Sequence, residues 1–108
     1  MAKKVLGQSN PSAVTATTLY TVPSSKEAVV SSISICNLAS SSATYRIAIR
    51  PAGASLSNQH YLAYDVTVGA ADTTIITVGI TLATTDVITV YASTANLAFS
   101  AFGDEAAA

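Results

Sequence analysis

Hydrophobic and polar residues alternate with a period of two along most of the chain, and no segment has a convincing helical period. The cleanest case runs from Ala43 to Arg50, where Tyr45, Ile47 and Ile49 point one way and the residues between them point the other. A period of two is typical of a β-strand with one buried face. The pattern therefore predicts an all-β protein.

Turn residues divide this pattern into seven or eight strands at intervals of roughly 8–12 residues. Strands are expected at residues 17–22, 28–38, 43–50, 60–68, 73–78, 87–92 and 97–102, with residues 79–82 continuing or bending the strand before them. This spacing is typical of a single antiparallel β-sandwich of jelly-roll or related topology. The expected core consists of apolar residues that share a strand face: Val29, Ile33, Ile35, Tyr45, Ile47, Ile49, Leu62, Tyr64, Val66, Ile88, Val90, Leu97 and Phe99.

The two ends of the chain lack this alternation. Residues 1–16 are small and polar and predict an extended N-terminal arm, residues 17–102 form the sandwich domain, and residues 103–108 form a C-terminal tail. We expect the arm to be ordered only in an assembly, where it would lie on a neighbouring chain. No apolar run follows Lys3 and Lys4, which favours a mature cytosolic start over a signal peptide.

Composition points to an assembly. Charged residues make up 10% of the chain and the net charge is -1, whereas about 25% charged residues is usual for a soluble domain. With five Lys and Arg residues, a strongly electrostatic nucleic-acid binder is excluded, and no apolar run is long enough for a membrane span. A surface made mostly of Ser, Thr and Ala leaves strand edges unguarded, so we expect a homo-oligomer, a trimer or a dimer, with the strand at 97–102 as a candidate edge. The alternative is a neutral β-protein that is soluble by itself.

Candidate catalytic groups are few. His60 is the single histidine and is expected at the start of a strand, with its nearest acid, Asp65, on the opposite face. Cys36 is the single cysteine, so no disulfide forms, and no nearby cation favours a reactive thiolate. No G-x-S-x-G nucleophile turn occurs. The sequence therefore predicts no catalytic residue, no metal site and no cofactor, and the protein is not expected to be an enzyme.

Five residues are candidates for contacts with other proteins. Arg46 and Arg50 share a strand face about 13 Å apart, given a rise of about 3.3 Å per residue. They belong either to a solvated outer face or to an interface, where Arg is enriched. In the arm, Val5, Leu6 and Val14 are apolar and would be of little use in a solvated tail.

Six stretches of the chain form a recognisable pattern: LGQSNPSAVTATTLYTVP, AVVSSISICN, YRIAIRPAGA, HYLAYD, GITLATTDVITVYAS and LAFSAFGDE. Together they cover about residues 6–105 and resemble a family of small all-β proteins in the virions of tailed bacteriophages. The resemblance implies a structural virion protein, made in the host cytoplasm, with itself and other virion proteins such as the major capsid protein as partners.

The resemblance leaves the place in the particle open. We expect a capsid decoration, or cement, protein; the alternative within the virion is a tail-associated component such as an adaptor or a fibre or spike base. A carbohydrate- or cell-surface-binding module is the alternative from another class. It would need exposed aromatic rings, for which Tyr20, Tyr61 and Tyr91 are the candidates.

Overall fold

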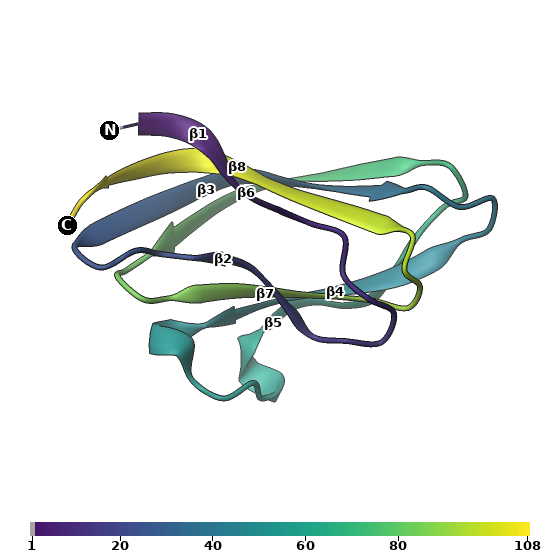
Figure 1. Ribbon diagram of the computed structural model, residues 1–108, viewed down its shortest axis with the longest axis horizontal. Coiled ribbons are helices and arrows are strands. Elements are labelled where there is room, and N and C mark those ends of the chain that lie inside the picture. Colours follow the sequence, from purple (N-terminus) through teal and green to yellow (C-terminus); the bar gives the residue numbers. More distant parts are fainter. Residues whose placement is uncertain (1) are drawn as a thin grey trace.

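The computed structural model describes residues 2–108 and folds them into two four-stranded sheets that pack face to face (Figure 1). One sheet has the order β1-β8-β3-β6 and the other the order β2-β7-β4-β5. The strands are β1 (Ala2–Ser9), β2 (Thr17–Thr21), β3 (Lys26–Asn37), β4 (Ala43–Arg50), β5 (Tyr61–Val68), β6 (Thr73–Leu82), β7 (Val87–Ala92) and β8 (Leu97–Ala107). Two short 3-10 turns, η1 (Pro51–Gly53) and η2 (Asn58–His60), lie between β4 and β5. The prediction of an all-β antiparallel sandwich is confirmed.

The pairing of the strands follows one rule. Each strand of the first half pairs antiparallel with its counterpart counted from the other end: β1 with β8, β2 with β7, β3 with β6 and β4 with β5. Further pairing of β3 with β8 and of β4 with β7 joins these pairs into the two sheets. The arrangement leaves β1 and β6 as the edges of one sheet and β2 and β5 as the edges of the other.

The core lies between the two sheets and contains most of the predicted residues. Eight of them are buried as expected: Ile33, Ile35, Tyr45, Ile47, Ile88, Val90, Leu97 and Phe99. Ile49 is partly buried and packs against them. The prediction is wrong for Val29, which is half-buried, and for Leu62, Tyr64 and Val66, which are exposed.

Two β-bulges explain the differences at Val29 and Tyr64, whereas Val66 pairs with buried Tyr45 and is exposed because β5 is an edge strand. In β3 the pairing shifts between Val30 and Ser32, so Val30 and Ile33 both face inward although they are three residues apart. Val29 consequently faces away from the core. A bulge inserts one residue and thereby moves all residues beyond it to the other face. A similar shift occurs in the pairing of β4 with β5, between Tyr45 and Ile47.

The predicted N-terminal arm is wrong for Ala2–Ser9, which form strand β1. This strand pairs with β8 of the same chain, and Leu6 is buried in the core. The segment that follows is anchored as well, because the Asn10 side-chain amide donates hydrogen bonds to the carbonyl oxygens of Ala95 (3.0 Å) and Leu97 (2.8 Å). The hydrophobic pattern does not reveal this strand, because backbone pairing with β8 holds it in place and only one large side chain points inward. Met1 lies outside the described residues.

The predicted C-terminal tail and edge are also wrong. Gly103 to Ala107 continue β8, which lies between β1 and β3 and is not an edge. Gly103 makes the close packing here possible, because a Cβ atom at this position would collide with the backbone carbonyl of Val29. The sandwich domain therefore begins at β1 and extends almost to the end of the chain.

A hydrogen-bonded group of three residues ties the two sheets together near the chain termini. The Tyr20 hydroxyl, on β2, donates a 2.6 Å hydrogen bond to Oε2 of Glu105, on β8. Lys4, on β1, binds Oε1 of the same carboxylate at 3.3 Å. The hydrogen bond from Tyr20 is the main reason why the pKa of Glu105 is lowered from its ordinary value of 4.5.

Replacing Tyr20 by Phe should make the stability of the fold less dependent on acid pH. A carboxyl whose pKa is lowered in the folded state stabilises the fold above its unfolded pKa and loses that contribution as the pH falls through the folded value. We therefore expect Tyr20→Phe to unfold at lower urea concentration than the wild type at pH 7. The two proteins should converge as the pH falls through the lowered pKa of Glu105 in the folded state, because the carboxyl is protonated below it. An equal difference in the urea midpoint at pH 7 and pH 3 would contradict this role for Glu105.

Within residues 2–108, no helix has the length and apolar character that a membrane crossing would need.

Candidate functional site

Strand β6 is the least protected edge of the sandwich. Its ten residues, TTIITVGITL, include no charged residue and no proline. Natural sheets guard their edges with lysines, prolines, bulges or short strands. By contrast, edge β1 carries Lys3 and Lys4, edge β2 is only five residues long, and edge β5 carries Asp65. Both β5 and β6 have an irregularity in their pairing, which in β6 lies opposite Val30 and Ser32. β6 thus presents a long row of unpaired backbone groups to solvent.

An apolar slot opens beside this edge, between the two sheets. It has a volume of about 320 Å³, and its lining residues, which include Leu62, Ile76 and Val78, are all apolar or glycine. On the outer face of β6, Ile75 is 66% exposed. Exposed apolar area of this kind is characteristic of surfaces that contact another molecule. The slot and the β6 edge together form one continuous candidate interface.

The structure places the predicted interface residues apart from one another. Leu6 is in the core and is therefore unavailable to a partner, which corrects that part of the prediction. Val5 and Val14 are exposed. Arg50 is used within the chain, because its guanidinium donates hydrogen bonds to Oγ1 of Thr89 (3.1 Å) and to the carbonyl of Ala54 (3.2 Å). None of these residues lies on β6, which the sequence did not single out.

Arg46 is the centre of a second cluster, on the outer face of the sheet β2-β7-β4-β5. Its guanidinium carbon lies 4.1 Å from the ring centroid of Tyr64 and 4.2 Å from that of Tyr91, so it is held between two aromatic rings. Its Nε and a terminal nitrogen donate hydrogen bonds of 2.7 and 3.3 Å to the two carboxylate oxygens of Asp65. These hydrogen bonds raise the pKa of Arg46 further above its ordinary value. The side chain is a permanent cation whose charge is already paired.

A bulge in β5 brings this cluster together. Tyr45 pairs with Val66 and Ile47 pairs with Ala63, so Tyr64 and Asp65 both lie opposite Arg46. Asp65 has a φ angle of 52°, in the left-handed region, as the bulge requires. The extra residue lets a ring and a carboxylate reach the same guanidinium, whereas regular alternation would send one of them to the other face.

Two of the three tyrosines proposed as sugar-stacking residues lie near this cluster. Tyr91 stacks on Arg46, and Tyr61 contacts Tyr64 edge to face with ring centroids 4.9 Å apart. Tyr20 is buried in the core and does not belong to it. The alternation from residue 60 to 68 predicts Tyr64 in the core, which is wrong because that pattern gives no sign of the bulge.

The residues with catalytic potential lie apart from one another. His60 is buried, and its Nδ1 accepts a hydrogen bond from the backbone N–H of Ser57 (3.1 Å), which closes the turn η2. Cys36 is half-buried on β3. Asp86 accepts hydrogen bonds from the backbone N–H groups of Ala52 and Ala83 and so stabilises two turns. Among residues 2–108, no three His, Cys, Asp or Glu side chains gather as a metal site would require.

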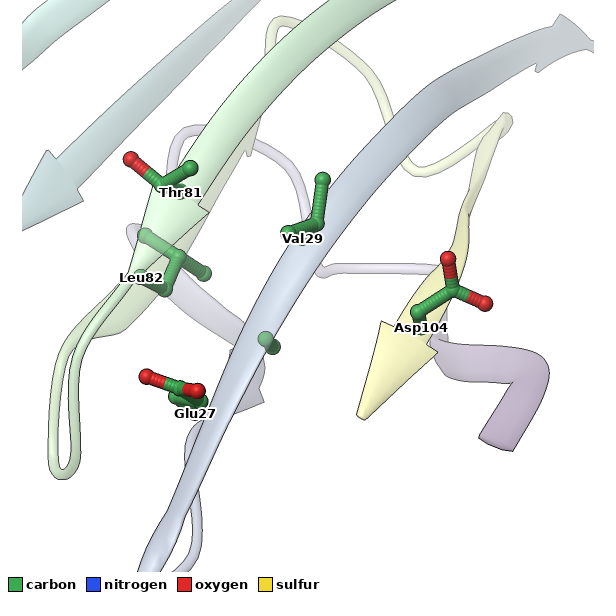
Figure 2. Close-up of a pocket in the computed structure, with 6 residues that line it drawn as sticks. Glu27, Val29, Thr81, Leu82 and Asp104 are labelled. Carbon is green, nitrogen blue, oxygen red and sulfur yellow. The ribbon is translucent and has the colours of Figure 1, made fainter. Parts of the chain in front are cut away.

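A shallow hollow of about 240 Å³ lies over β3, with two carboxylates at its rim. Figure 2 shows Glu27 and Asp104 on either side of the strand, with Val29 between them. Thr81 and Leu82 form the remaining wall, on β6. The two acids come from neighbouring strands, β3 and β8, and do not converge on a common point. The hollow adjoins the β6 edge but shares no lining residue with the apolar slot.

Comparisons with protein-family models, with curated proteins and with solved structures give no match for this chain.

Proposed function

We propose that the protein is a non-catalytic structural component of a tailed-phage virion, a capsid decoration protein that acts through protein–protein contacts. The resemblance of its sequence to virion proteins supplies the context. The observation that carries the mode of action is the ten-residue, uncharged β6 edge beside an apolar slot. A free monomer would be expected to guard such an edge.

The strand order supports the same proposal. We infer that the pairing of β1 with β8, β2 with β7, β3 with β6 and β4 with β5 makes the sandwich a jelly roll, in which a long four-stranded hairpin is rolled into two sheets. This architecture is widespread in viral capsid proteins and in lectins. It provides a rigid body whose loops and edges are free to carry contacts.

The occupant of the β6 edge is a second copy of the chain. A two-fold axis near the middle of β6 would pair the strand antiparallel with itself, and each contact would occur twice. Because β6 contains no charged residue, no like charges would face each other across the axis. The strand is about 34 Å long at 3.4 Å per residue, and a copy paired along it would lie beside the mouth of the apolar slot. Of the trimer and the dimer expected from composition, the dimer fits this edge.

A lysine in the middle of β6 should separate the two copies. Thr77 is exposed and central in the strand, so Thr77→Lys would place two positive charges close together at the axis. Like charges on facing positions of a strand pair are destabilising, and an edge lysine is itself a natural guard. We expect self-association to weaken by roughly tenfold or more, measured by sedimentation velocity over a concentration series.

The control is Thr18→Lys, which makes the same change at an exposed position of the short edge β2. It should associate like the wild type. A wild-type protein that stays monomeric at every concentration would refute the dimer, and equal weakening by both lysines would show that the contact does not lie at β6.

A further inference from the structure

We propose that the outer face of β5 carries a binding site for a neutral pyranose sugar, formed by Tyr61, Tyr64 and Asn58. This site is separate from the β6 edge, since it lies on the outside of the other sheet. Three observations support this site: the geometry of the two tyrosines, the paired charges of Arg46 and Asp65 beside them, and the anchoring of the loop between β4 and β5.

The three residues line a hollow of about 350 Å³. Tyr61 and Tyr64 stand at 90° to each other with ring centroids 4.9 Å apart, so they form a corner. Tyr64 is 56% exposed even though one of its faces lies on the Arg46 guanidinium. Asn58 belongs to the turn η2 and adds an amide, which can both donate and accept hydrogen bonds.

This set of groups suits a sugar. The face of an aromatic ring is electron-rich, and the C–H groups on one face of a pyranose carry partial positive charge, so the two pack together. The sugar hydroxyls at the rim of the ring need donors and acceptors, which the Asn58 amide and the tyrosine hydroxyls supply. Asp65 is also partly exposed beside the hollow, and each of its oxygens keeps a lone pair after binding Arg46.

The charge of the site favours a neutral ligand. The Arg46 guanidinium contacts Tyr64, and its charge is paired with Asp65 at 2.7 Å. An anionic sugar would have to compete with Asp65 for that guanidinium, and a cationic sugar would be repelled by the permanent charge of Arg46 beside the Tyr64 ring. A neutral hexopyranose meets neither obstacle.

The hollow is held in shape by bonds within the chain. The loop between β4 and β5 is tied down at three points: Arg50 binds the Ala54 carbonyl, Asp86 binds the Ala52 N–H, and His60 accepts from the Ser57 N–H. On the other side, the Tyr64 ring packs on the Arg46 guanidinium, which is itself held by Tyr91. Binding therefore needs little ordering of the protein, which lowers its entropic cost.

The test is to titrate the protein with the methyl glycosides of glucose, galactose and N-acetylglucosamine, followed by NMR of the tyrosine ring signals. The five tyrosines divide into buried Tyr20 and Tyr45 and accessible Tyr61, Tyr64 and Tyr91, so the buried pair serves as an internal reference. We expect at least one glycoside to shift the Tyr61 and Tyr64 signals with a dissociation constant on the order of 1 mM. Tyr64→Ala should weaken this binding by roughly tenfold.

Two further variants keep the result decisive. Asn58→Ala changes an exposed turn residue and should also weaken binding, so it serves as the test if Tyr64→Ala does not fold. Val14→Ala, at an exposed position away from the site, should bind like the wild type. The proposal is overturned if none of the three glycosides shifts these signals, if glucuronic acid binds and the neutral sugars do not, or if binding survives in Tyr64→Ala and Asn58→Ala. Thr77→Lys should bind sugar normally, which separates this site from the proposed dimer.

Discussion

Phe99→Ala should lower the free energy of unfolding by about 3–5 kcal/mol, the usual cost of removing a fully buried aromatic side chain. Phe99 is completely buried. Its ring packs edge to face on Tyr45, across the interface between the sheets, with centroids 6.3 Å apart and an interplanar angle of 76°. Since β8 lies between β1 and β3, the surrounding backbone has little freedom to close the cavity.

Urea unfolding followed by circular dichroism measures this effect. The control is Phe102→Ala, which removes the same side chain in the same strand at a half-buried position. It should cost clearly less than Phe99→Ala. If the two variants were equally destabilised, burial between the sheets would not be the source of the effect.

Gly103→Ala should destabilise the protein by about 1–3 kcal/mol, the range for overpacking a filled interior. A Cβ atom at Gly103 would collide with the carbonyl of Val29 on the neighbouring strand. Backbone on one side and the paired strand β1 on the other leave no room for adjustment. Thermal unfolding with circular dichroism is a sufficient measurement.

Gly79→Ala is the matched control, because a Cβ atom there has no neighbour within 4 Å. It lies on the open edge β6 and, at a protein concentration low enough for the chain to be monomeric, should leave the melting temperature nearly unchanged. A loss of stability at Gly79 as large as that at Gly103 would contradict the close approach of β8 and β3.

The internal strands were predictable from the sequence because one face of each is buried. β4 and β7 have the predicted bounds, 43–50 and 87–92. What the sequence did not reveal depends on backbone pairing. β1 has a single large buried side chain, and Gly103 to Ala107 join β8 through hydrogen bonds to both neighbours. Such segments have no hydrophobic period to detect.

The candidate surfaces were harder to predict than the core for the same reason. Arg46 was identified as a candidate, but its partners Tyr64 and Asp65 lie opposite it only because of a bulge. Without that bulge, period-two alternation assigns Tyr64 to the core. The exposed edge is set by the order of the strands across the sheet, which local patterns do not specify. The sequence therefore suggested β8 as an edge, whereas β6 occupies that position.

The proposed role in the virion is tested most directly by electron cryo-microscopy of phage particles with and without this gene, compared at equal resolution. If the protein decorates the capsid, deletion should remove density from the outer surface of the head and leave the tail unchanged. Adding back purified wild-type protein or Thr18→Lys should restore that density, and Thr77→Lys should restore less of it. Heads that are identical in the two maps, or a loss confined to the tail, would contradict the proposal.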